Sequence, residues 1–209
     1  MGKAVLISIQ PQWCELIASG KKSVEVRKTK PNINTPFKVY IYQTKKTWVY
    51  NLYSKIADWQ GKVIGEFMCK KIDRIGRRGF DNNFDYCYLS LDVFGNDDIE
   101  IEITDIKKSC ILKKELNLYG EKANCLYAWH ITNLVIYDEP KELSEFHTVD
   151  KDAVRSCGHR HQSYCSAQCD SGYIKNGFYC DRTADWCTQC TTKPITRAPQ
   201  SWCFVEELR

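Results

Sequence analysis

The spacing of apolar residues changes its period within residues 11–28, and no other feature constrains the fold as strongly. Residues 11–19 fit a helix of two turns that begins at a proline and ends at Gly20. After Gly20 the period is two, with two valines on one side of the chain and two charged residues on the other: Val24 and Val26 opposite Glu25 and Arg27. The pattern predicts a helix followed by a strand whose charged side lies at a sheet edge or barrel mouth, where it would form a site.

Short segments of alternating, aromatic or β-branched residues recur along the chain and predict further strands. The predicted strands are residues 4–9, 23–28, 37–44, 62–72, 99–104, 125–137 and 201–207. Two more helices are predicted, one over residues 110–118 with Ser109 as its cap and Gly120 at its end, and a short one over residues 140–146. Many short strands and few helices predict a mainly β fold of the α+β class, a small β-barrel with peripheral helices.

Residues 45–60 form an aromatic-rich segment between two predicted strands. They contain Trp48, Tyr50, Tyr53 and Trp59. Two interpretations remain open: the rings pack against the barrel wall, or they form a surface on which nucleic-acid bases stack.

Length and charge limit the possible functions. A chain of 209 residues accommodates one barrel and an appendage, and it contains no apolar run of membrane-spanning length. The sequence therefore predicts a cytoplasmic protein without a membrane partner. The net charge of +4 permits an anionic partner without requiring one. Basic residues gather in two places, at Lys21, Lys22, Arg27, Lys28 and Lys30, and at Arg74, Arg77 and Arg78. The second group is equally compatible with a solvated loop.

The element Gly20-x-Lys22-x-x-Glu25-x-Arg27 also carries a family resemblance. With the apolar segments around residues 6–9, 37–42, 61–67, 126–131 and 199–207, it resembles the ASCH family, which belongs to the PUA-like group of small RNA-associated β-barrels. The resemblance implies a PUA-like barrel and covers about two thirds of the chain. The element is moderately specific alone, and flanking strands strengthen it.

The resemblance has functional implications. ASCH relatives are thought to bind RNA or nucleotides in a cleft lined by this element. Some are hydrolases that remove the acetyl group from acetylated cytidine or cleave RNA, and a lysine matching Lys22 is implicated in both. The deacetylases have a threonine nucleophile where this chain has Glu25, so their covalent mechanism is not implied here. Their assisting glutamate has only rough positional matches, Glu66 and Glu121.

Two functions from different classes follow. The first is a non-catalytic module that binds RNA or a modified nucleotide through phosphate contacts and base stacking. Its candidate ligand-binding residues are Ser8, Trp13, Lys21, Lys22, Glu25, Arg27, Lys28, Tyr40 and Trp129. The second is a small hydrolase acting on a nucleoside amide or on RNA, with Lys22 and Glu25 as the catalytic pair. Both predict that Lys22, Glu25 and Arg27 converge on a solvent-open cleft. The remaining alternative is a structural ion-pair ladder.

Half of the twelve cysteines lie within residues 157–190, beside His159 and His161. This window has too little apolar surface to fold unaided, and its cysteine spacings suit structural zinc, one or two ions. The candidate ligands are Cys157, Cys165, Cys169, Cys180, Cys187 and Cys190. Disulfides are the alternative. The predicted organisation is a barrel over residues 1–150, a zinc-stapled insert over 151–196 and a closing strand over 197–209.

Overall fold

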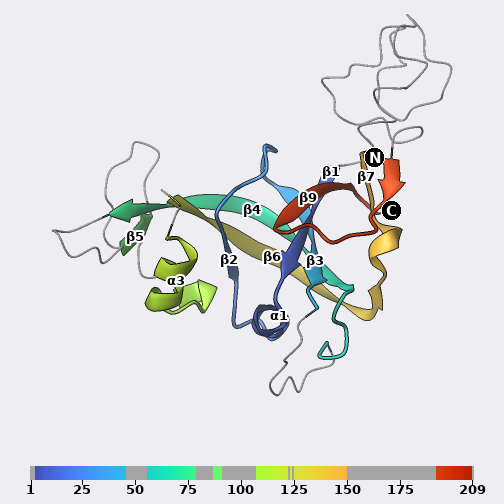
Figure 1. Cartoon of the computed structure of the whole chain (residues 1–209), viewed down its shortest axis with the longest axis horizontal. Helices are drawn as coiled ribbons and strands as arrows, with labels where there is room; N and C mark the ends of the chain where they lie inside the picture. Colours follow the sequence, from blue (N-terminus) through green and yellow to red (C-terminus); the bar gives the residue numbers. More distant parts are fainter. Residues whose placement is uncertain are drawn as a thin grey trace, which may run out of the picture.

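The computed structural model describes residues 3–45, 56–78, 87–90, 107–121, 123, 125–149 and 192–208 (Figure 1). The predicted strand 99–104, three of the four aromatics of residues 45–60 and the cysteines of residues 157–190 lie outside these ranges. The strands are β1 (Lys3–Ile9), β2 (Val24–Arg27), β3 (Phe37–Gln43), β4 (Val63–Arg78), β5 (Cys87–Ser90), β6 (Cys125–Lys141), β7 (His147–Val149), β8 (Thr192–Pro194) and β9 (Trp202–Glu206). The helices are α1 (Pro11–Ala18), α3 (Lys113–Tyr119) and the 3-10 turn η1 (Leu143–Glu145).

Most strands form one mixed sheet in the order β2-β6-β4-β3-β1-β9, and β5 pairs with β4. The β1–β3 pair is parallel, with Val5 opposite Val39. The other pairs are antiparallel, and β1 is joined to β9 with Lys3 opposite Glu206. Strands from the two ends of the described chain therefore lie side by side. A separate two-stranded sheet pairs β7 with β8.

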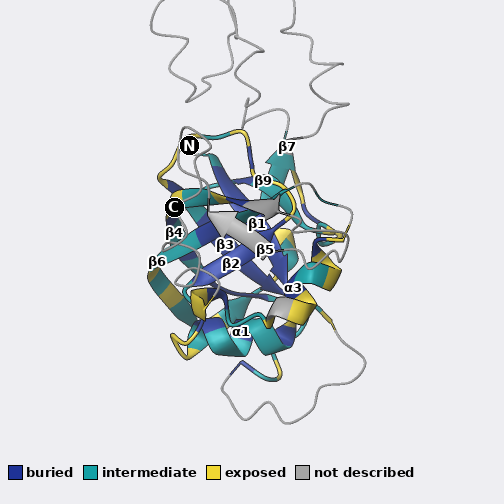
Figure 2. Cartoon of the chain, turned by 90° about the vertical axis from the view of Figure 1, so that its left-hand side faces the viewer, coloured by how far each residue is buried: buried dark blue, intermediate teal, exposed yellow. Residues whose placement is uncertain are grey.

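Alternation along the strands gives the main sheet two apolar faces. One face, here called the inner face, carries Val5, Ile7, Val39, Ile41 and Trp129, against which α1 packs Cys14 and Ile17. The opposite face is covered in two places. Phe146 and Ile195 pack on Tyr40 and its neighbours, and Leu116 of α3 packs on Val24 and Val26 of β2. Figure 2 shows the buried strands above the more exposed helices α1 and α3.

The main sheet is open, whereas the sequence predicted a closed barrel. Among the described residues, the hydrogen-bonded order ends at β2 on one side and at β9 on the other. Side chains connect these ends instead: Arg27 donates to the Ser8 carbonyl, and Trp202 Nε1 donates to Thr29 Oγ1 at 3.0 Å. Closure of this order would need β2 to pair with β9, and within the described residues these two ends are linked by side chains and not by backbone pairing.

The helices agree with the sequence in part. Helix α1 begins at Pro11, and Gly20, with a φ of +73°, ends its turn in the left-handed region that glycine tolerates best. Helix α3 ends at Gly120, as predicted, but begins at Lys113 with Leu112 as its N-cap rather than at Ser109. The helix predicted over residues 140–146 is only the turn η1, because β6 continues to Lys141. None of the described helices has the length and apolar composition needed to cross a bilayer.

Candidate functional site

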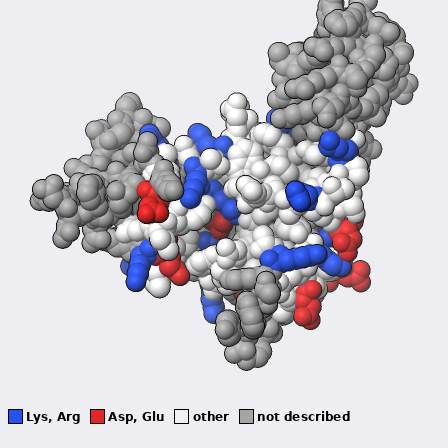
Figure 3. Space-filling model, in the orientation of Figure 1, with Lys and Arg blue, Asp and Glu red and all other residues white. Residues whose placement is uncertain are grey.

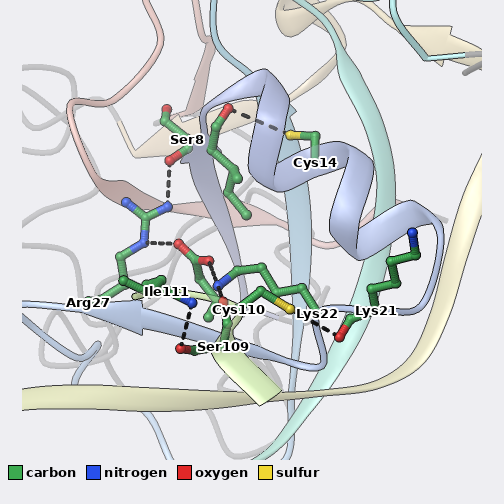
Figure 4. A network of polar contacts seen from close by, with 10 residues as sticks. Ser8, Cys14, Lys21, Lys22, Arg27, Ser109, Cys110 and Ile111 are labelled. Carbon is green, nitrogen blue, oxygen red and sulfur yellow. Dashed lines mark hydrogen bonds and ion pairs between the residues drawn. The ribbon is translucent and has the colours of Figure 1, made fainter. Parts of the chain in front are cut away.

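The side chains of Lys22, Glu25 and Arg27 meet on the inner face beside α1, and we call these three residues the charged triad (Figure 4). Lys22 Nζ lies 3.3 Å from Glu25 Oε2, and Arg27 Nε lies 3.1 Å from Glu25 Oε1. Each oxygen of the carboxylate therefore faces a different cation. The alternation of β2 produces this arrangement, since its two valines pack beneath α3 and leave Glu25 and Arg27 on the other side.

Arg27 connects the triad to β1. Its Nη2 donates to the carbonyl of Ser8, which lies in β1 just beyond the residues paired with β9. The Ser8 hydroxyl points elsewhere and donates to the Pro199 carbonyl at 2.6 Å. Ser8, one of the candidate ligand-binding residues, thus contributes its backbone carbonyl to the site.

Lys22 has neutral partners as well as Glu25. Its ammonium donates to the Ser109 carbonyl at 2.6 Å and lies 5.1 Å from the ring centroid of Trp13. The turn after α1 sets its position, because the Lys22 backbone N–H donates to the Leu16 carbonyl at 2.9 Å. A buried ammonium with one carbonyl, one carboxylate and one aromatic face is well compensated.

The triad is buried, whereas the sequence predicted an open cleft. The exposed fractions of the side chains are 1 % for Lys22, 8 % for Glu25 and 10 % for Arg27. The three charges converge as expected, but Trp13 of α1 and the segment around Ser109 cover Lys22. Within the triad, two cations and one carboxylate leave a net charge of +1 in a region of low dielectric.

The low polarity of the surroundings is visible in a neighbouring thiol. Cys14 of α1 is fully buried, and its Sγ donates to the Ile9 carbonyl at 3.6 Å. Burial raises the pKa of Cys14 well above its usual value, and the negative charge of Glu25 adds to the effect. This thiol is therefore inert at neutral pH and has no role as a nucleophile at the site.

Aromatic rings line the inner face next to the triad. Trp129 lies opposite Glu25 in the β2–β6 pair and is fully buried. Its ring is 5.9 Å from that of Phe37 and 6.3 Å from that of Trp202, which in turn lies 5.5 Å from Phe204. The indole Nε1 of Trp129 has no hydrogen-bond acceptor in the described part of the chain. It is a donor that a bound molecule could use.

An exposed rim of basic and aromatic residues surrounds the buried triad. Lys28 lies 4.9 Å from the ring centroid of Tyr119, and Lys30 lies 5.9 Å from that of Tyr127. Both lysines are exposed. Figure 3 shows Lys and Arg side chains gathered over β2 and the chain that follows it. Burial raises the pKa of Tyr119, and the positive charge of Arg27 acts against this rise, which places the tyrosine within the electrostatic reach of the triad.

Some predicted site residues lie elsewhere. Tyr40 is on the opposite face of the sheet, where its hydroxyl accepts a hydrogen bond from the Leu208 N–H at 2.7 Å. Glu66 lies near it and pairs with Lys38 at 3.3 Å, so it does not approach the triad. The Lys21 side chain extends away from the triad in Figure 4. Trp13 and Trp129 do lie beside the triad.

Several residues of the site carry no signal in the sequence. Ser109 enters through its carbonyl, which any residue possesses, and it was interpreted as a helix cap. Tyr119, Tyr127 and Trp202 are brought in by α3, β6 and β9. The sequence features that pointed to this region were the basic cluster that includes Lys30 and the aromatic residues of the strands now seen as β6 and β9.

A second charged pair lies on β4 and β6. His130 Nε2 is 2.7 Å from Asp73 Oδ2, and Lys71 Nζ lies 2.8 Å from the same oxygen. No group of three or more metal-ligating side chains occurs within the ranges that the structure describes. His130 lies in β6, opposite Val24 of β2.

Comparisons with known proteins decide the family. The sequence model of the ASCH domain matches residues 7–142, which is more than half of the chain. The chain belongs to the ASCH domain family. A search of curated proteins found no match.

Solved structures of one ASCH protein are among those to which this chain is similar. The crystal structure of ASCH from Zymomonas mobilis shares 18 % identity over 67 % of this chain and 73 % of its own, with a TM-score of 0.45. Two mutant structures of that protein give 16 % and 18 % identity over 67 % of this chain, 76 % and 74 % of their own, and TM-scores of 0.44 and 0.45. The ASCH match ends before β7, so residues 143–209, with β9, lie outside it.

Proposed function

We propose that this ASCH-domain protein binds RNA or a nucleotide at the charged triad and its exposed rim. The observation that supports this most is the combination of a buried, net positive triad with two exposed lysines held over tyrosine rings at its edge. Membership in a family commonly associated with RNA binding agrees with it.

The chemistry of the rim suits a single strand. Lys28 and Lys30 supply positive charge for phosphates, and Tyr119 and Tyr127 supply rings on which bases can stack. Single-stranded RNA is usually recognised by this combination, because its unpaired bases expose both faces and edges. Tyr119 keeps more than a third of its surface exposed even with Lys28 beside it.

Titration of a short single-stranded RNA against the protein tests the proposal. We expect the double variant Lys28→Ala, Lys30→Ala to bind about ten-fold or more weakly, since two phosphate contacts are lost. Lys193→Ala, which removes an exposed cation from β8 in the separate two-stranded sheet, is the matched control and should bind as the wild type does. About three phosphate contacts imply a slope near −2 in a plot of log affinity against log salt. Equal binding by both variants, or affinity that ignores salt, would contradict the proposed interface.

A hydrolase is the second candidate, and the direct contact of Lys22 with Glu25 favours it. Lys22 would stabilise negative charge on the attacked group, and Glu25 would activate water or a 2′-hydroxyl. Binding without catalysis fits the site better, because both oxygens of Glu25 already face a cation and so a free base is lacking. Lys22→Met separates the two: a binder loses affinity, whereas a hydrolase of acetylated cytidine or RNA loses turnover even with saturating substrate.

We also propose structural zinc for residues 157–190, with the six cysteines as ligands and His159 or His161 as further candidates. Their number and spacing support it. Protein purified under reducing conditions should contain one or two equivalents of zinc, and chelation should expose the thiols of Cys187 and Cys190 to alkylation. Little zinc, together with thiols that titrate as paired, would indicate disulfides instead.

A further inference from the structure

We propose that residues 107–111 form a displaceable strap over Lys22, and that a ligand phosphate takes the place of the Ser109 carbonyl. The inference rests on the proposed function, because it names the group that Lys22 would bind. Figure 4 labels Ser109, Cys110 and Ile111 of the strap next to Lys22.

The strap is held to the start of β2 by hydrogen bonds. The Ser109 carbonyl accepts from Lys22 Nζ at 2.6 Å, the Lys108 carbonyl accepts from the Ser23 N–H at 3.0 Å, and Cys110 Sγ donates to the Lys21 carbonyl at 3.2 Å. Such contacts can be exchanged for contacts with water or a ligand at little net cost, unlike the burial of a large apolar surface.

Two features have opposite effects on the stability of the closed strap. Ile111 packs partly against the apolar cluster beneath α3 and anchors the end of the strap. Cys110 has a φ of +57°, a left-handed conformation that a residue with a Cβ adopts at a cost. The closed strap is therefore both anchored and conformationally unfavourable at one residue, which is suited to a segment that opens.

The closed strap covers the ammonium of Lys22, which is the cation that the proposed phosphate would contact. With the strap closed, the Lys22 ammonium faces the Ser109 carbonyl, Glu25 and the ring of Trp13, and its side chain is 1 % exposed. A ligand that contacts Lys22 must replace one of these groups. Replacing Glu25 would leave two buried cations without a counter-charge, whereas replacing Ser109 removes only a neutral acceptor.

The net positive charge of the triad favours a phosphate as the group that replaces the Ser109 carbonyl. The triad carries a net charge of +1, and a neutral carbonyl does not compensate it. An anionic phosphate oxygen would donate no proton, would accept from the same ammonium and would neutralise the excess charge. The carbonyl of a nucleobase would satisfy the hydrogen bond alone, so it is the weaker competitor.

The alkylation rate of Cys110 reports on the strap, because its thiol is hydrogen-bonded only while the strap lies against Lys21. We would measure this rate by peptide mass spectrometry on the full chain with cytidine, cytidine monophosphate, inorganic phosphate or a short single-stranded RNA. Cys69 and Cys203 are internal references, since burial raises their pKa values to about 12 and about 11 and keeps them slow.

The proposal expects the RNA and the monophosphate to accelerate Cys110 alkylation several-fold, with the same concentration dependence as binding. Inorganic phosphate should do so weakly and cytidine not at all. Acceleration by cytidine equal to that by its monophosphate would overturn the assignment to phosphate. Binding that leaves the Cys110 rate unchanged or lower would overturn the strap but leave the proposed function standing. Absence of binding by every probe would overturn both.

Two neighbouring substitutions give a second, matched measurement. Ile111→Ala removes the anchor, and it should speed alkylation of Cys110 and tighten binding of the monophosphate, because less free energy is then spent on opening. Leu112→Ala truncates a residue that is 70 % exposed and should change neither quantity. Faster alkylation without tighter binding would contradict the proposal, and the wild-type measurement remains decisive if Ile111→Ala fails to fold.

Discussion

Glu25 is the residue on which the two buried cations depend. Its oxygens face Lys22 and Arg27, and all three side chains are at most 10 % exposed. A buried ion pair is not a strong source of stability by itself, but removing one partner leaves an uncompensated charge in a low dielectric.

We therefore expect Glu25→Gln to lower the free energy of unfolding by about 3–5 kcal/mol in urea denaturation. The matched substitution is Glu66→Gln, which breaks an ion pair with Lys38 whose side chains are 23 % and 25 % exposed. That change should cost about 0–1 kcal/mol, since solvent screens the pair. Equal losses of unfolding free energy in the two variants would show that Lys22 and Arg27 do not depend on the charge of Glu25.

Asp73 gives a prediction about acid stability. Burial favours the protonated carboxyl, but hydrogen bonds from His130 and Lys71 outweigh burial and lower the pKa of Asp73 from 3.8 to about 2. Because the folded chain holds this proton less tightly than the unfolded chain, the stabilisation is present at neutral pH. It is lost as the pH falls from 3.8 through about 2.

Asp73→Asn should therefore flatten the fall of the unfolding free energy across that acid range, as measured by urea denaturation at a series of pH values. Asp138→Asn, at an exposed position of β6, is the control and should leave the steepness unchanged. Identical acid profiles for wild type and Asp73→Asn would contradict the prediction.

At the scale of elements, α3 supports the site from behind. Leu116 is 1 % exposed and packs on Val24 and Val26, whose strand carries Glu25 and Arg27 on its other side. We expect Leu116→Ala to cost about 2–5 kcal/mol of unfolding free energy and to weaken ligand binding, because β2 loses its backing. Leu118→Ala on the same helix truncates a side chain that is 75 % exposed and should cost little. Thermal melts and RNA titrations of both variants make the comparison.

Elements with local signals could be predicted from the sequence. Pro11, Gly20 and the change of period define α1 and β2 without any knowledge of the rest of the chain. The start of α3 could not be predicted in this way, because residues 107–109 are themselves helical and Cys110, with a φ of +57°, interrupts the helical backbone before Lys113. A left-handed residue other than glycine or asparagine leaves little signal in the sequence.

The candidate site could likewise be predicted only where the signal lies within one strand. Alternation along β2 was sufficient to bring Glu25 and Arg27 to one side. Burial of the triad depends on α1 and the strap folding over it, which a pattern along one strand does not record. Tyr40 was misplaced because the face it occupies follows from the β1–β3 register, which puts it opposite Leu6 and away from the triad.

At the scale of the whole molecule, the described residues on either side of residues 150–191 pair with each other. Val149 pairs with Thr192, and His147 pairs with Pro194. We expect that replacing residues 150–191 by a two-residue Asn-Gly turn preserves the main sheet, because such a turn joins antiparallel neighbours directly. Circular dichroism and the melting temperature would test this, with the RNA titration as a functional readout. Loss of the β-sheet signal in the shortened chain would mean that the segment is needed for the main sheet.

The pairing of β1 with β9 has a consequence for biosynthesis. During translation β1 is made long before β9, the strand that pairs with one of its edges and places Glu206 opposite Lys3. Until then one side of β1 offers unpaired backbone groups beside fully apolar side chains such as Val5 and Ile7. A ribosome-bound chain that stops short of β9 therefore exposes an unpaired strand edge that is prone to aggregation, and the newly made protein should rely on chaperones until β9 has emerged.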